Sequence, residues 1–167
     1  MLTVAPECWL DELIGQKLLS GCGLRKSDYR IEKAQNFSDS ISKLYAPRHT
    51  PIISIVDAVR DKKQTRKNPV YQSLSLYGQQ GQDTLIKQFN GRKAYLFEFT
   101  LTAEDWLRRY VPASFFTKHK VDRNLEARTK SISVRNYTEL HNLLDDFLRN
   151  EPKGQELVSL FRSLLPA

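Results

Sequence analysis

The spacing of hydrophobic residues predicts helices near both ends of the chain. Between residues 6 and 20, apolar side chains from Trp9 to Leu19 fall on nearly one helical face, and Gly-Cys-Gly at 21–23 supplies a stop. The segments 136–150 and 154–165 show the same spacing, with the breaker Glu-Pro-Lys-Gly between them. We expect these last two helices to form an antiparallel pair.

Other segments have the apolar, β-branched or aromatic character of strands. Residues 51–59 (PIISIVDAV) predict a strand that feeds a helix, and 94–101 (AYLFEFTL) predict the best strand in the chain. A shorter run at 84–89 precedes that strand across the turn pair Asn90-Gly91. Residues 127–136 alternate polar and apolar positions, as in an edge strand.

Capping signals add two short helices and complete the predicted fold. Asn68-Pro69 predicts a helix over 69–77, and Thr102 opens an approximate capping box for a helix that stops before Pro112. The order of elements favours an α+β protein with a small sheet of two or three strands covered by helices. We expect residues 1–136 to form this α+β part and the helical pair at 137–167 to pack on it within one domain.

Composition agrees with a folded chain that does not enter a membrane. Of the 167 residues 40% are hydrophobic, and the apolar runs are far shorter than the roughly 20 residues that cross a bilayer. The first residues carry acids where a signal peptide has cations. We therefore expect an intracellular protein, in the cytoplasm or nucleoid, with no membrane partner.

The two cysteines predict neither a disulfide nor a zinc site. Cys8 and Cys22 flank the first predicted helix, whose rise would separate them by roughly 20 Å. The sequence places no second cysteine pair or histidine near them. We expect two buried free thiols, no metal site and no cofactor.

Positive charge is concentrated in the middle of the chain, and this distribution is the first indication of a binding partner. Residues 60–135 hold 16 Lys and Arg against 7 Asp and Glu, whereas the flanks together hold 10 basic and 12 acidic residues. Lys and Arg that neutralise phosphates release condensed counterions, so a basic band favours a polyanionic partner. The alternative is a solvated surface that keeps the protein soluble.

Within this band, two clusters are candidates for nucleic-acid binding. The first combines the cations before the helix predicted at 69–77 with polar and aromatic side chains that can contact phosphates or bases. It consists of Arg60, Lys62, Lys63, Arg66, Lys67, Tyr71, Gln72, Ser73 and Ser75. The second cluster, which could line the same surface, includes Arg109, Lys118, Lys120 and Arg123.

Catalytic motifs are scarce. Asp57 and Glu98 are the strand-associated acids that could converge to hold Mg²⁺ for phosphodiester cleavage, although position 100, where such sites place a Lys, is Thr. The structural alternative makes Asp57 a helix-start residue and Glu98 an exposed strand residue. No phosphate-binding glycine loop, nucleophile elbow or HExxH spacing is present in the sequence.

Residues 53–82 resemble part of a known DNA-binding module. ISIVDAV at 53–59, Asn68-Pro69, Tyr71 and the Gly-Gln-rich turn at 78–82 are similar to the N-terminal module of BRO and phage antirepressor proteins. The resemblance implies a strand-helix unit whose helix at 69–77, with the cations before it, contacts DNA. It also implies a phage or mobile-element regulator.

The sequence as a whole favours a non-enzymatic, DNA-binding protein. Phosphate neutralisation by residues 60–77 and 108–135 would supply the affinity, and the terminal helices would form core or homodimer contacts. Three alternatives stay open: binding of RNA or single strands, a Mg²⁺-dependent nuclease that uses Asp57 and Glu98, and an adaptor for an acidic protein partner.

Overall fold

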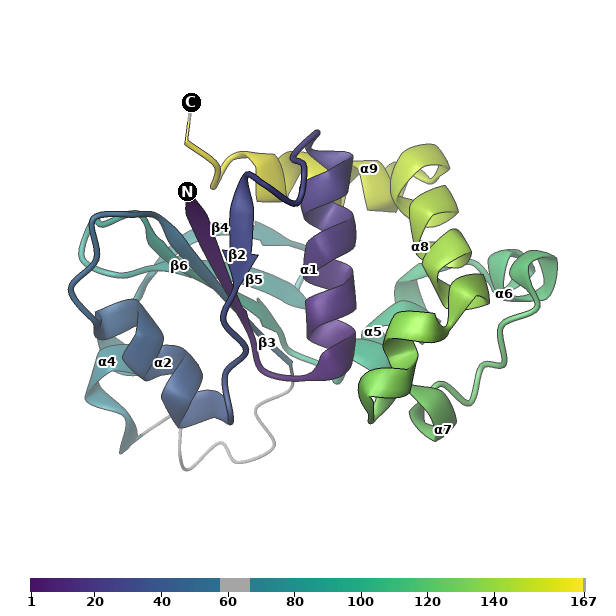
Figure 1. Ribbon diagram of the computed structural model, residues 1–167, viewed down its shortest axis with the longest axis horizontal. Helices are drawn as coiled ribbons and strands as arrows, with labels where there is room; N and C mark the ends of the chain where they lie inside the picture. The colour runs from purple at the N-terminus through teal and green to yellow at the C-terminus, as the bar shows by residue number, and fades with distance from the viewer. Residues whose placement is uncertain (58–66, 167) are drawn as a thin grey trace.

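A mixed β-sheet with helices on both faces forms the centre of the molecule (Figure 1). The structure is a computed structural model that describes residues 1–57 and 67–166. In this part of the chain the sheet has six strands in the order β2-β1-β3-β6-β5-β4. Strands β2, β1, β3 and β6 run parallel, and β5 and β4 continue the sheet antiparallel. The strands are β1 (Leu2–Pro6), β2 (Tyr29–Ile31), β3 (Ile52–Val56), β4 (Ser75–Gln80), β5 (Thr84–Gln88) and β6 (Ala94–Phe99).

Two helical layers cover the sheet. Helices α2 and α4 lie on one face, and α1 lies on the other with the helices of the C-terminal half (Figure 1). The helices are α1 (Trp9–Gly21), α2 (Phe37–Tyr45), α4 (Pro69–Ser73), α5 (Ala103–Tyr110), α6 (Ala113–His119), α7 (Glu126–Thr129), α8 (Thr138–Asn150) and α9 (Pro152–Arg162), with a 3₁₀ turn at Ile132–Asn136. None of the helices in the described ranges is both long and apolar enough to span a membrane.

The central strands are buried from both sides. Ile53 and Ile55 of β3 pack into the core beneath α1, whereas Ile52 and Val56 pack into the core beneath α2. Parallel strands covered on both faces have nearly continuous apolar sequences, as β1 and β3 do. The mixed, largely parallel sheet makes this an α/β protein rather than the expected α+β protein with two or three strands.

One glycine fixes how closely α1 approaches the sheet. A Cβ atom built on Gly15 would lie 2.6 Å from Cδ1 of Ile55 and 3.7 Å from Cγ1 of Val4. A side chain at position 15 would therefore require the terminal methyl group of Ile55 to move. This contact seats the helix whose first turn carries the site described below.

Several capping and turn predictions are confirmed. Asn68 accepts hydrogen bonds from the N–H groups of Val70 and Tyr71, and Thr102 accepts one from Asp105. Asn90 and Gly91 have positive φ in the turn between β5 and β6. The C-terminal pair α8 and α9 also forms, and Phe147 and Phe161 join the same core cluster as α1.

Two local predictions are wrong. The helix expected over 69–77 ends at Ser73, because residues from Ser75 onward pair with β5. The edge strand expected at 127–136 is instead α7 and a 3₁₀ turn. Thr129 and Val134 are both buried there, although a strand would point them to opposite faces.

Candidate metal centre at the carboxyl ends of β1 and β3

The carboxyl ends of β1 and β3 lie side by side where the chain changes direction across the sheet. From β1 the chain passes through α1 to β2 on one side, and then through α2 to β3 on the other side. The N–H of Glu7 donates to the carbonyl of Ile55 over 3.0 Å, which extends the pairing to the strand ends. Such a switch point is where open α/β sheets bind ligands.

Three side chains converge at this point. Cys8 Sγ and one carboxylate oxygen each of Asp11 and Asp57 lie within 4.8 Å of one another. Cys8 caps α1: its Sγ accepts the N–H of Asp11 at 3.3 Å, and Asp11 Oδ2 accepts the N–H of Cys8 at 3.2 Å. Asp57 Oδ2 accepts the N–H of Ala103 at the start of α5, over 2.9 Å. Backbone hydrogen bonds therefore hold all three side chains.

Asp11 is an exceptional carboxylate. Its side chain is 0% exposed, and Oδ1 has no hydrogen-bond partner among the described residues. Burial, and then the negative charge of Asp57, raise the pKa of Asp11 well above its usual value. A buried, unpaired carboxylate oxygen is costly, so this arrangement calls for a bound cation or proton.

Glu7 adds another acid beside the cluster. Burial, and then repulsion from Asp57, raise the pKa of Glu7 to about 7, although a hydrogen bond from the backbone of Phe37 acts in the opposite direction. Burial and the neighbouring Asp11 likewise raise the pKa of the Cys8 thiol. Negative charge has thus been concentrated in a place where water screens it poorly.

Three helix N-termini meet the acids of this site. Asp11 lies in the first turn of α1, Glu7 accepts the first N–H of α2, and Asp57 accepts the first N–H of α5. Helix dipoles favour negative charge at N-termini and partly offset the repulsion between the acids. Two carboxylates and a thiol are suitable ligands for a divalent metal ion. The thiol is a softer ligand than the two carboxylates.

A basic, aromatic patch borders the cluster. Trp9, the first residue of α1, has Lys33 Nζ at 3.3 Å and the Arg135 guanidinium at 4.9 Å from its ring centroid. Trp9 and Arg135 also line a cavity of about 420 Å³ together with Glu12, which bonds Arg135 at 2.8 Å. Lys33 and Arg135 therefore place positive charge over the ring of the residue that follows Cys8.

Glu98 does not belong to this group. Contrary to the expected exposed position, its side chain is buried, with 7% exposure. Its carboxylate forms an ion pair with Lys87 at 3.1 Å and accepts the hydroxyl of Tyr71 at 3.0 Å. Among the described residues, Asp57 converges with Cys8, the N-cap of α1, and with Asp11 in its first turn, whereas Glu98 is paired with Lys87.

The first predicted nucleic-acid cluster is only partly within the described residues. Arg60, Lys62, Lys63 and Arg66 lie outside them, whereas Lys67 and Gln72 are exposed. The Tyr71 hydroxyl is committed to Glu98 and Lys87, and its ring contacts Phe37. The hydroxyls of Ser73 and Ser75 donate to the carbonyls of Val70 and Gln88.

The second cluster lies on the opposite face of the sheet from α4. Arg109 pairs with Asp83 at 3.3 Å and Lys118 pairs with Asp146 at 2.8 Å, which partly neutralises both cations. Lys120 ends α6 in a left-handed conformation, and Arg123 lies over the ring of Phe116. The structure therefore separates α4 from the helices α5 and α6, which the sequence had left free to share one surface.

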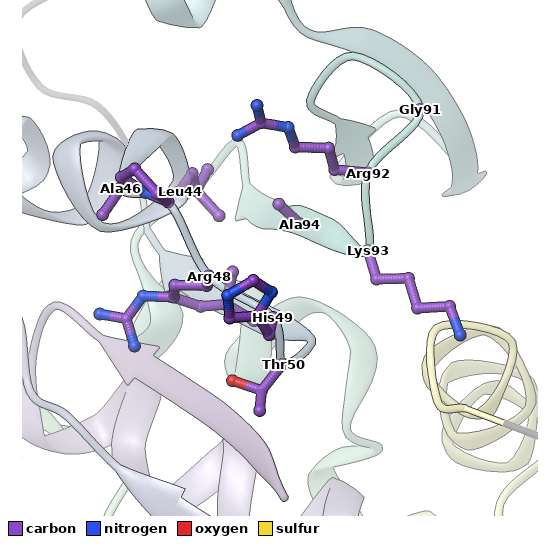
Figure 2. Close-up of a pocket in the computed structure, with 11 residues that line it drawn as sticks. Leu44, Ala46, Arg48, His49, Thr50, Gly91, Arg92, Lys93 and Ala94 are labelled. Carbon is purple, nitrogen blue, oxygen red and sulfur yellow. The ribbon is translucent and has the colours of Figure 1, made fainter.

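A second hollow, of about 530 Å³, lies at the other end of the parallel strands, beside the amino ends of β3 and β6. Arg48, Arg92 and Lys93 line it, but Figure 2 shows their side chains pointing in different directions. Arg48 is already bound to Glu32 at 2.8 Å. These cations do not converge on one ligand position, so we favour the cluster at the carboxyl ends.

The sequence does indicate this cluster, but the apolar pattern of the predicted helix at 6–20 hides the short strand that precedes it. Glu7, Cys8 and Asp11 stand directly before and within the first turn of α1, but β1 was not predicted because its five residues run into the apolar pattern of the helix. A strand followed at once by acids at a helix start would have indicated a ligand site. No family model, curated protein or solved structure was found to match the chain.

Proposed function

We propose that this chain is a divalent-cation-dependent enzyme that acts on phosphodiester bonds of nucleic acid. The observation that carries the proposal is the buried, unpaired oxygen of Asp11 beside Asp57 and Cys8 at the switch point of the sheet. Side chains arranged in this way hold a metal ion on backbone-anchored ligands. A metal ion there would polarise a phosphoryl oxygen and lower the pKa of a bound water molecule.

Charge around the site supports a polyanionic substrate. Lys33 and Arg135 flank Trp9 next to the cluster, and in the sequence Asp57 is followed within ten residues by five cations from Arg60 to Lys67. Cations at the border of an acidic metal centre attract phosphates while the metal neutralises the acids. The protein's contribution is thus to position a phosphodiester bond against the ion.

The test compares cleavage and metal binding in the same preparations. Supercoiled plasmid, single-stranded DNA and RNA are incubated with the wild-type protein in Mg²⁺, Mn²⁺, Zn²⁺ or a chelator, and ion binding is followed by calorimetry. We expect cleavage of at least one substrate only with a divalent ion, and its loss in Asp11→Asn. Glu98→Gln, once its melting curve shows that it is folded under the assay conditions, is the matched control, because it also neutralises a buried acid near the strand ends.

Two results would contradict the proposal. If no divalent ion binds, the cluster is not a metal centre. If the chain binds nucleic acid equally well in chelator and cleaves none of the three substrates with any of the ions, the non-enzymatic DNA-binding hypothesis is correct instead.

A further inference from the structure

We infer that Cys8 is a thiolate ligand of the metal centre and directs it toward Zn²⁺ or Co²⁺ rather than Mg²⁺. This inference rests on the proposed function, because it concerns the identity of the ion at the same site. It follows from the position of Cys8 Sγ within 4.8 Å of ligand oxygens of both Asp11 and Asp57.

The backbone holds the sulfur in place. Cys8 is the N-cap of α1 with an extended backbone, and the N–H of Asp11 donates to its Sγ at 3.3 Å. The reciprocal hydrogen bond from the N–H of Cys8 to Asp11 Oδ2 ties two of the three ligands into one unit. An N–H donor also stabilises the negative sulfur that a metal–thiolate bond requires.

Capping alone does not explain a cysteine at position 8. Ser, Thr, Asp and Asn are the residues preferred at an N-cap, and each would accept the N–H of Asp11 at least as well. A sulfur atom differs from those residues in its softness, which matters to a transition metal or zinc and not to Mg²⁺. The chemistry of the donor set therefore points to a borderline divalent ion.

The number of ligands is that of a reactive centre. One sulfur and two carboxylates provide three protein ligands, whereas structural zinc sites use four. With these three ligands from the described residues, a bound ion would still take water or a phosphoryl oxygen. On binding, the Cys8 thiol loses its proton to the solvent as the sulfur–metal bond forms, and no oxidation state changes.

Cobalt is the sharpest probe, because a cobalt–thiolate bond gives a near-ultraviolet charge-transfer band that carboxylate ligands do not give. The full-length chain is titrated with Co²⁺, and Zn²⁺ and Mg²⁺ affinities are then measured by competition. Cys22→Ser is the matched control, since Cys22 is a half-buried free thiol beyond the other end of α1. Cys8→Ser keeps a preferred capping residue, so the fold should survive.

We expect one equivalent of Co²⁺ to produce the band in the wild type and in Cys22→Ser, but not in Cys8→Ser. Zn²⁺ affinity should fall in Cys8→Ser by at least the roughly 10–100-fold that loss of an outer-shell partner costs, with little change for Mg²⁺. Binding of Co²⁺ without the band, or a band that survives Cys8→Ser, overturns this inference but leaves a carboxylate metal centre. Absence of any divalent binding overturns the proposed function itself.

Discussion

Asp11 and Glu98 are both buried carboxylates near the carboxyl ends of the parallel strands, yet they differ in what surrounds them. Glu98 faces Lys87 and the Tyr71 hydroxyl, so its charge is compensated within the protein. Asp11 faces Asp57 and Cys8, and its Oδ1 has no partner among the described residues. Burial by itself therefore does not identify a functional acid. A buried carboxylate that lacks a counter-charge or a hydrogen-bond donor does.

The largest loss of stability should come from removing the negative charge of Glu98, which Lys87 compensates. Glu98→Gln leaves the half-buried ammonium of Lys87 without its counter-charge, and breaking a buried ion pair costs up to about 3 kcal/mol. We expect the free energy of unfolding in urea to fall by about that amount.

Metal affinity should stay unchanged in Glu98→Gln. If this variant instead loses metal binding and keeps its stability, then Glu98 belongs to the metal centre and the contrast with Asp11 disappears.

A gain of stability, rather than a loss, is expected when the charge is removed at the proposed metal centre. Asp11→Asn replaces a buried acid that Asp57 repels by a neutral amide, so the metal-free protein should gain stability, by about 1–2 kcal/mol where Asp11 would be ionised. The same variant should lose the stabilisation that Mn²⁺ or Zn²⁺ gives the wild type. Thermal melts with and without the ion measure both quantities, and destabilisation of the metal-free protein would show that Asp11 is structural.

The acids of the metal centre should also set the pH dependence of stability. Glu7 binds its proton more tightly when folded, because its pKa rises from the ordinary 4.5 of a glutamate to about 7. Stability of the metal-free protein should thus be unaffected below about pH 4.5 and fall as pH rises toward and through 7. Solvent screening at this half-buried side chain limits the effect to the order of 1 kcal/mol.

Unfolding of the wild type and of Glu7→Gln between pH 5 and 8, in chelator, measures this effect. A flatter curve for Glu7→Gln is expected. Equal slopes in the two proteins would assign the pH dependence to other groups.

The smallest effect should come from Tyr71→Phe. This change removes the hydroxyl that donates to Glu98 while the ring keeps its contact with Phe37. A loss of about 1 kcal/mol is typical of one such hydrogen bond. Affinity for nucleic acid, measured by fluorescence anisotropy, should not change; a clear decrease would restore Tyr71 to the binding surface predicted from the sequence.

Local signals predicted much of this fold, and tertiary pairing decided the rest. The caps at Asn68 and Thr102 and the turn at Asn90-Gly91 depend on neighbouring residues, so the sequence shows them directly. The parallel order of β1, β3 and β6 depends on contacts between distant segments. Ser75 to Gln80 forms a strand because β5 is available to pair with it, which no local pattern shows.

The sequence indicated one acid of the candidate site, Asp57, but not Asp11. Asp57 was chosen because it ends an apolar strand, and the structure does place it at a strand end. Glu98 was chosen by the same argument, but only a three-dimensional neighbour, Lys87 on β5, shows that it is compensated. Asp11 was overlooked because an acid in the first turn of a helix is ordinary, and its burial results from the packing of α1 on the sheet.

The close approach of α1 to the sheet at Gly15 offers a way to adjust the proposed metal centre from a distance. The ligands Cys8 and Asp11 move with the first turn of that helix, whereas Asp57 stays with the sheet. Gly15 of the helix packs against Ile55 of the sheet, so this contact joins the two elements that carry the proposed ligands. A protein engineer could tune the preferred ion size by changing the volume of residue 55, without altering any ligand.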